Sequence, residues 1–146
     1  MKPSWIEYFL GIAEAASVRS SCERSKVGAV ISDRNNRVVA VGYNDAPSGM
    51  PGCETCPRRT SNVESGSSYD TGPGKCVSLH AEQNCVLHAR REDMAGGTIW
   101  ITRPPCDGCL KMLMGTDLSA AQWPNGFAYL KGDLAGVPCD TNIWHP

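Results

Sequence analysis

The feature that most constrains the fold of this chain is its set of eight cysteines, which includes two C-x-x-C pairs. Cys53 and Cys56 lie in a long polar segment, whereas Cys106 and Cys109 directly follow two prolines. The N-terminus does not read as an export signal, because acidic residues interrupt the apolar pattern of "MKPSWIEYFLGIAEAA". In a reducing compartment, such pairs bind metal more often than they form disulfides. We therefore expect a cytoplasmic protein whose fold gathers cysteines around metal ions.

The composition fits one globular domain that spans residues 1–146. Hydrophobic residues make up 41% of the chain and charged residues 20%, which is typical of a soluble domain with a real core. The 14 Lys and Arg residues against 15 Asp and Glu residues give a net charge of −1. This balance argues against a broad basic surface for long nucleic acid. No apolar run approaches the roughly 18 residues of a membrane span, so no membrane partner is expected.

The periodicity of apolar residues predicts alternating helices and strands. Helices are expected over residues 4–18, 79–92 and 106–114. Strands are expected over residues 27–31 and 38–41, which form a hairpin, and over residues 97–102 and, more weakly, 118–123. Residues 44–77 form a long loop that needs to be tied down, and residues 124–146 show no clear period. This order predicts an α/β domain with helices packed on a shared sheet.

A metal-binding pattern falls at the predicted starts of two helices. His80 lies two residues before Glu82 in "LHAEQN", and Cys106 and Cys109 occupy one face of the next helix. One histidine and two thiolates supply three ligands to zinc, which leaves the fourth tetrahedral position open for water, as in catalytic sites. Glu82 is then placed to move protons instead of binding the metal. The order H-x-E followed by P-C-x-x-C is the signature of zinc-dependent deaminases.

Four stretches of the chain resemble the cytidine deaminase superfamily, and most closely its deoxycytidylate (dCMP) deaminases. The matching stretches read "CERSKVGAVI", "GYNDAPSGMPGC", "LHAEQN" and "TRPPCDGCLKML", and the resemblance covers residues 5 to about 114. It implies a three-layer α/β/α fold around a mixed sheet of about five strands, and hydrolytic deamination of dCMP to dUMP with release of ammonia. It also implies His80, Cys106 and Cys109 as zinc ligands, Glu82 as the proton shuttle, and Asn44 as the residue that meets the sugar and base edge.

The remaining upstream cysteines suggest a second, structural zinc site. Four thiolates from Cys22, Cys53, Cys56 and Cys76 would form a closed site and hold the 44–77 loop. The resemblance implies Cys22 and Cys53, because many dCMP deaminases bind a second zinc at these positions, whereas Cys56 and Cys76 are inferred here. The alternative is four free thiols packed as small hydrophobic side chains.

Nucleotide recognition requires cationic side chains, for which the sequence offers three candidates. Arg24 and Lys26 precede the first strand and are substrate-binding candidates, or else solvated loop charges. Arg91 ends the second helix, where it could complement the helix dipole, but the resemblance places an effector site at its position.

Assembly and control are likewise implied by the resemblance. It indicates a homo-oligomer, commonly a hexamer built from dimers, that is activated by dCTP and inhibited by dTTP, with Mg²⁺ accompanying the triphosphate. Asp45 stands where the family usually has Gly, and its negative charge is expected to weaken or abolish this activation.

Two other functions remain open at the level of sequence. The first is deamination of another nucleoside, a modified cytosine nucleotide or a nucleic acid base, of which transfer RNA is disfavoured by the balanced charge. The second is a non-catalytic zinc module that binds a partner. Glu82 argues against the latter, because a purely structural site has no use for an acid beside an open ligand position.

Overall fold

The computed structural model describes residues 1–22, 24–51, 53, 56–62, 64, 66–69 and 71–140. The elements run in the order α1 (Trp5–Ser17), β1 (Gly28–Ser32), β2 (Val38–Tyr43), α2 (Pro57–Thr60), α3 (Ala81–His88), α4 (Arg91–Met94), β3 (Thr98–Ile101), α5 (Asp107–Met114), β4 (Ala120–Trp123), β5 (Gly126–Tyr129) and β6 (Cys139–Asp140). One sheet contains six strands in the order β2-β1-β3-β4-β5-β6. Strands β3 and β4 are parallel, and the other neighbouring pairs are antiparallel.

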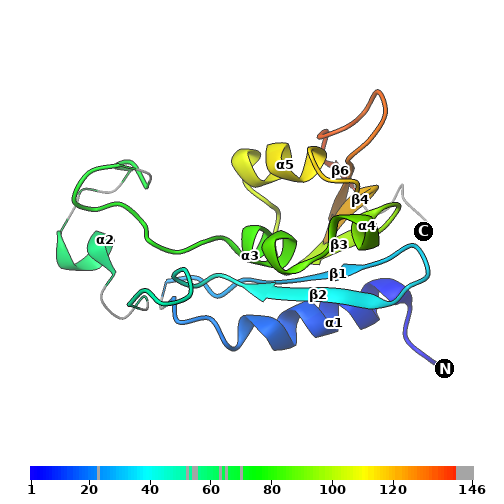
Figure 1. Cartoon of the computed structure of the whole chain (residues 1–146), viewed down its shortest axis with the longest axis horizontal. Coiled ribbons are helices and arrows are strands. Elements are labelled where there is room, and N and C mark those ends of the chain that lie inside the picture. Colours follow the sequence, from blue (N-terminus) through cyan, green and yellow to red (C-terminus); the bar gives the residue numbers. More distant parts are fainter. Residues whose placement is uncertain are drawn as a thin grey trace.

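Helices cover both faces of this sheet (Figure 1). Helix α1 lies on one face, where Phe9 and Ala13 pack against Val30 and Trp100. Helices α3 and α5 lie on the other face and enclose the larger core cluster, which includes Cys85, Leu110 and Leu113. The expected three-layer α/β/α arrangement is therefore confirmed, with a two-residue sixth strand added at one edge of the sheet.

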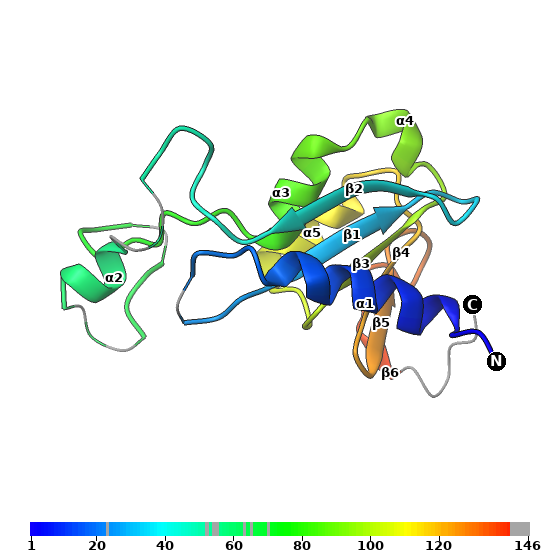
Figure 2. The same ribbon diagram turned by 90° about the horizontal axis from the view of Figure 1, so that it is seen from below.

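Helix α1 begins where the sequence predicts and faces the sheet through residues one turn apart. The side chain of Ser4 accepts a hydrogen bond from Glu7 N at 3.1 Å and so caps the helix. Phe9 is fully buried and stacks on Trp100, with ring centroids 5.0 Å apart. Figure 2 shows α1 crossing the face formed by β1 and β2.

Gly42 allows helix α3 to pack directly on strand β2. A Cβ atom at this position would lie 2.6 Å from Cys85 N and 2.7 Å from Ala81 O, both of which are backbone atoms of α3. Asn84 adds a hydrogen bond from Nδ2 to Tyr43 O at 2.8 Å. The position of α3 is therefore fixed by backbone contact with the sheet and not only by side-chain packing.

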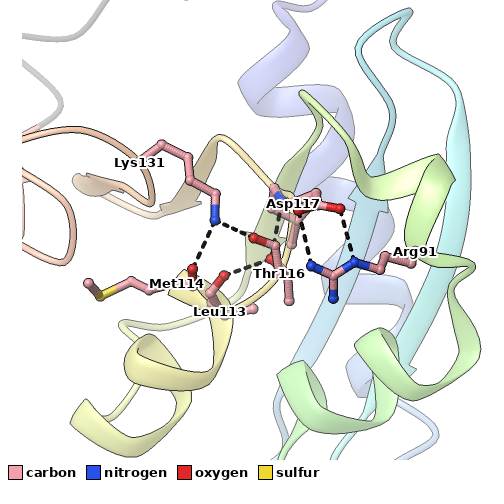
Figure 3. A network of polar contacts seen from close by, with 7 residues as sticks. Arg91, Leu113, Met114, Thr116, Asp117 and Lys131 are labelled. Carbon is pink, nitrogen blue, oxygen red and sulfur yellow. Dashed lines mark hydrogen bonds and ion pairs between the residues drawn. The ribbon is translucent and has the colours of Figure 1, made fainter.

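Helix α5 is held at its C-terminal end by Lys131, which follows β5 (Figure 3). Lys131 Nζ donates to Met114 O at 2.9 Å and to Thr116 O. Met114 is the last residue of α5 and Thr116 lies just beyond its C-cap, where backbone acceptors lack helical partners and a cation is favoured. Thr116 Oγ1 also donates to Leu113 O at 2.6 Å. The network anchors the helix whose opposite end carries Cys106 and Cys109.

The 44–77 segment leaves the body of the domain and returns at nearly the same point. Asp45 N donates to Leu79 O at 3.2 Å, and Leu79 N donates to Asp45 O at 2.8 Å, so the two residues form an antiparallel bridge. Between them the chain extends away from the sheet and includes the short helix α2 (Figures 1 and 2). The bridge places Leu79, and with it His80, beside the end of β2.

Two expectations from the sequence are wrong in their boundaries. The helix expected over residues 79–92 is broken, because Ala89 adopts an extended conformation with φ −91° and ψ 151° before α4 begins at Arg91. The segment after residue 123 contains two further strands, β5 and β6, and Asn125 makes the β4–β5 turn at φ 65°.

Residues 141–146 lie outside the described part of the chain. Among the described residues, no helix is long and apolar enough to cross a bilayer.

Candidate active site

The start of α3 places His80 and Glu82 at one end of the sheet. His80 is the N-cap residue, and its backbone N–H donates to Gln83 Oε1 at 2.7 Å. Glu82 lies in the first turn and is only 4% exposed. A carboxylate with so little contact with solvent is suited to exchanging protons with a bound molecule.

The start of α5 brings two thiols to the same place. Cys106 is the N-cap residue of α5, and its Sγ accepts from Cys109 N at 3.4 Å. His80 Nδ1 lies 3.6 Å from Cys106 Sγ and 3.2 Å from Cys109 Sγ. In a tetrahedral zinc site with the usual bond lengths, a nitrogen and a sulfur ligand lie about 3.6 Å apart. The three side chains therefore fit zinc, with Nδ1 as the histidine donor.

The electrostatics of this group call for a cation. Burial raises the pKa of the Cys109 thiol, and the neighbouring Glu82 carboxylate and Cys106 thiol raise it further. Three acidic groups so close together cannot all be anionic unless a positive charge compensates them. Zinc supplies that charge and binds thiolates in preference to thiols.

These residues open into a cavity of about 810 Å³, which lies in the range found for small-molecule sites. The same cavity is lined by the four upstream cysteines, Cys22, Cys53, Cys56 and Cys76. Burial raises the pKa of the Cys76 thiol, and the nearby thiols of Cys56, Cys53 and Cys22 raise it further. Among the described residues, however, the group whose ligand atoms converge is His80, Cys106 and Cys109, and the upstream thiols form no such group.

The proposed substrate-binding residues fall in different places. Arg24 and Asn44 line the cavity, whereas Lys26 is exposed and is not among its lining residues. Both polar atoms of the Asn44 amide bind backbone: Nδ2 donates to Ser25 O at 2.7 Å, and Oδ1 accepts from Val27 N at 2.8 Å. Asn44 therefore fixes the segment before β1 against the end of β2.

The residue proposed for an effector site lies elsewhere. Arg91 pairs with Asp117, with 3.1 Å between Nε and Oδ2, and its side chain remains largely exposed (Figure 3). Asp45 does not have a positive φ, and its half-buried carboxylate accepts hydrogen bonds from Ser21 Oγ and, at 2.9 Å, from Ala46 N. A negative φ at this position explains why an aspartate is tolerated in the loop.

Two basic residues of the cavity, Arg103 and Arg58, were not singled out from the sequence. Arg103 lies between β3 and α5 and donates from Nη1 to Ser25 Oγ. Arg58 is 7% exposed, with its guanidinium carbon 3.7 Å from the centroid of the Tyr69 ring. A basic residue directly before "PPC" was a signal for Arg103, but its partner Ser25 is distant in the sequence and could not be inferred.

A mixed sheet that brings one histidine, two cysteines and a buried glutamate together at two helix N-termini defines the zinc-dependent deaminase class. The family model for the cytidine and deoxycytidylate deaminase zinc-binding region matches residues 3–122, and the chain belongs to this family.

Several proteins of this family are similar to the chain over most of its length. The deoxycytidylate deaminase of Mycobacterium phage D29 is 48% identical over 84% of this chain and 96% of its own length. That of Schizosaccharomyces pombe is 41% identical over 74% of this chain but only 31% of its own length. The crystal structure of cyanophage S-TIM5 dCMP deaminase in complex with dCMP and dUMP is similar at a TM-score of 0.61 and 28% identity, covering 84% of this chain and 82% of that one.

Proposed function

We propose that this chain is a zinc-dependent hydrolase that deaminates dCMP to dUMP and ammonia. The observation that carries the proposal is the buried carboxylate of Glu82 beside the convergent group of His80, Cys106 and Cys109. The similarity to phage dCMP deaminases, one of them described with dCMP and dUMP, supports dCMP as the substrate.

Glu82 moves the protons of this reaction. His80, Cys106 and Cys109 would hold zinc, which would make a water molecule nucleophilic at neutral pH. Glu82 accepts a proton from that water and delivers it to N3 of cytosine while oxygen adds to C4. It then transfers the second water proton to the exocyclic amino group, and the bond from C4 to nitrogen breaks as ammonia leaves. The product is uracil, and Glu82 returns to its carboxylate form.

The positions of the substrate contacts are part of the proposal. Asn44 is assigned to the sugar and base edge, because it lines the cavity from the end of β2. Arg24 is assigned to the nucleotide as a cationic contact in the same cavity. Lys26 stays a candidate outside the lining residues, where it contributes positive charge at longer range.

A variant of the proton shuttle tests this function directly. Glu82→Ala should retain zinc and lose turnover, whereas the exposed Glu92→Ala should retain both. Activity is measured as ammonia release from deoxycytidine, dCMP, dCTP and dAMP, and zinc by metal analysis. Loss of zinc from Glu82→Ala, or retained turnover, contradicts the assignment of Glu82, and preference for another substrate in the panel contradicts dCMP.

A second, structural zinc bound by Cys22, Cys53, Cys56 and Cys76 is also proposed. The four thiols line one cavity, and Ser21 Oγ joins their segments by accepting from Cys53 N at 3.2 Å and donating to Asp45. Metal analysis should give about two zinc ions per chain. Cys53→Ser should lower this to about one and reduce thermal stability, whereas Cys139→Ser should not. A value near one for the unmodified protein rejects the second site.

The cellular setting and the assembly complete the proposal. Cysteine side chains stay reduced, and so able to bind zinc, in a reducing compartment, which supports a cytoplasmic location. A homo-oligomer, of hexamer type, is proposed because the chain is similar to dCMP deaminases, for which such assemblies are common. Light scattering tests this, and a monomer rejects it.

Regulation by a nucleotide is proposed to be weak. Arg91 is already paired with Asp117, and Asp45 adds negative charge at the start of the 44–77 loop. We therefore expect dCTP with Mg²⁺ to increase dCMP deamination only slightly. Kinetics of dCMP deamination with and without dCTP and Mg²⁺ test this. A sigmoidal curve that becomes hyperbolic with dCTP contradicts it.

A further inference from the structure

Arg103 occupies a position in the cavity that neither the metal site nor the proton shuttle explains. It lies on the connection between β3 and α5, shortly before Cys106, and its side chain is exposed. Its Nη1 donates to the side-chain oxygen of Ser25, from the segment that precedes β1. This hydrogen bond joins two walls of the cavity that are far apart in the sequence.

The charge balance of the cavity leaves Arg103 without an internal counterion. Among the described residues that line it, Glu82 is the only carboxylate, against the three arginines Arg24, Arg58 and Arg103. Glu82 lies beside Cys109, on the metal-binding side. No ion pair of Arg103 occurs among the described residues. The guanidinium of Arg103 therefore carries a positive charge that an anionic ligand in the cavity can neutralise.

Arg58 does not meet this description, although it lines the same cavity. Its Nη1 donates to Ser68 O at 2.8 Å, and its Nη2 donates to Ser67 Oγ at 3.1 Å. Its guanidinium also packs on the Tyr69 ring and is almost completely buried. These contacts assign Arg58 to holding the extended loop together.

Ser25 links Arg103 to the residue assigned to the sugar. The backbone oxygen of Ser25 accepts from Asn44 Nδ2 at 2.7 Å, while its hydroxyl oxygen accepts from Arg103. The guanidinium and Asn44 are thus held by the same residue. Such anchoring reduces the side-chain entropy that an arginine loses when it binds a ligand.

We propose that Arg103, oriented by Ser25, binds the 5′-phosphate of dCMP and sets the preference for the nucleotide over the nucleoside. This inference rests on the proposed deamination of dCMP. Ser25 accepts from Nη1, and within the described part of the chain no other acceptor of this guanidinium occurs, so its other N–H groups can donate to phosphate oxygens. Charge-assisted hydrogen bonds of a planar guanidinium to phosphate are strong and directional. Arg24, for which the described residues offer no hydrogen-bond or ion-pair partner, contributes less because it is not pre-oriented.

The test compares substrates that differ only in the phosphate. Arg103→Ala should lower kcat/KM for dCMP by about tenfold to a hundredfold, mostly through KM, and leave kcat/KM for deoxycytidine unchanged. Arg103→Lys should show an intermediate loss, because it keeps the charge but not the fork of donors. Ser25→Ala should show a smaller loss of the same kind. Arg37→Ala, an exposed arginine outside the lining residues, is the matched control and should behave as the unmodified protein.

A binding measurement separates this inference from the proposed reaction. Calorimetry of the zinc-loaded protein should show that Arg103→Ala weakens binding of dUMP and not of deoxyuridine, with zinc content unchanged. If the unmodified protein does not deaminate dCMP, the proposed function fails, while loss of dUMP binding in Arg103→Ala still supports the phosphate contact. Equal losses for nucleotide and nucleoside, or a nucleotide-specific loss in Arg24→Ala but not in Arg103→Ala, overturn the inference.

Discussion

Replacing Gly42 with alanine should displace the helix that carries His80 and Glu82. The added Cβ would lie 2.6 Å from Cys85 N and 2.7 Å from Ala81 O. Because non-bonded heavy atoms pack at about 3.5–4.0 Å, α3 must move away from β2 by about 1 Å. Backbone atoms cannot rotate out of the way as a long side chain can. Overpacking of this kind costs about 1–3 kcal/mol of stability.

The same displacement should lower the catalytic rate. A shift of about 1 Å in catalytic groups can cost about a hundredfold in rate. We therefore expect Gly42→Ala to lower kcat/KM for dCMP by about that factor at temperatures where the protein remains folded. It should also weaken zinc binding, because His80 moves away from Cys106 and Cys109.

Gly11→Ala provides the control for this experiment. Gly11 lies within α1, and a Cβ there would meet no atom within 4 Å. Alanine at an exposed helical position should stabilise the protein by up to about 1 kcal/mol and leave activity unchanged. Calorimetric Tm, zinc content and dCMP turnover are measured for both variants. If Gly42→Ala retains all three, the close contact of α3 with β2 does not position the site.

Three further predictions concern the anchoring of the helices and the titration of a buried thiol. Lys131→Met should lower the free energy of unfolding by about 1–2 kcal/mol, because the carbonyl groups of Met114 and Thr116 lose their donor. Lys111→Met is the control and should lack that effect. Equal losses of stability in the two variants, measured by calorimetry, would argue against the cap. Burial raises the pKa of the Cys85 thiol to about 12, so its folded form stays protonated while the unfolded form ionises above about pH 9. As pH rises from 8 to 10, the free energy of unfolding should therefore fall by about 1 kcal/mol more in the unmodified protein than in Cys85→Ala. Denaturant unfolding at each pH measures this, and parallel plots of stability against pH for the two proteins would refute it. His80→Ala should lower the zinc content, whereas the exposed His88→Ala should not, and equal metal content in the two variants would remove His80 from the ligand set.

The fold could be predicted up to β4, which the sequence indicates more weakly over residues 118–123, because the preceding elements carry strong local signals. The helix expected over residues 4–18 corresponds to α1, and the hairpin expected from residues 27–31 and 38–41 corresponds to β1 and β2. The break at Ala89 was missed because "LHARRED" contains only residues compatible with a helix. The strands after Trp123 were missed because "GFAY" and "CD" are short and contain Gly, Ala and Asp, which have low strand propensity. Burial and pairing in the sheet form these strands despite that propensity.

The candidate site could be predicted where ligand chemistry fixes residue types and spacing. His80, Cys106 and Cys109 converge as the sequence pattern indicates, because each lies at the N-terminus of a helix. The pairing of Arg103 with Ser25 depends on a long-range contact, for which the sequence contains no periodic signal. Lys26 was assigned together with Arg24 because both precede the first strand, but of the two only Arg24 lines the cavity.

The bridge between Asp45 and Leu79 has a consequence for how proteins of this kind diversify. The segment 46–78 leaves and re-enters the domain at one pair of hydrogen-bonded residues, so its length can change without altering β2 or α3. The entropic cost of closing a flexible loop grows only slowly with length. The same segment supplies one side of the cavity, through residues such as Arg58 and Tyr69. It can therefore be exchanged as a cassette between related chains, by recombination or by grafting, which would change what enters the cavity while leaving His80, Cys106 and Cys109 in place.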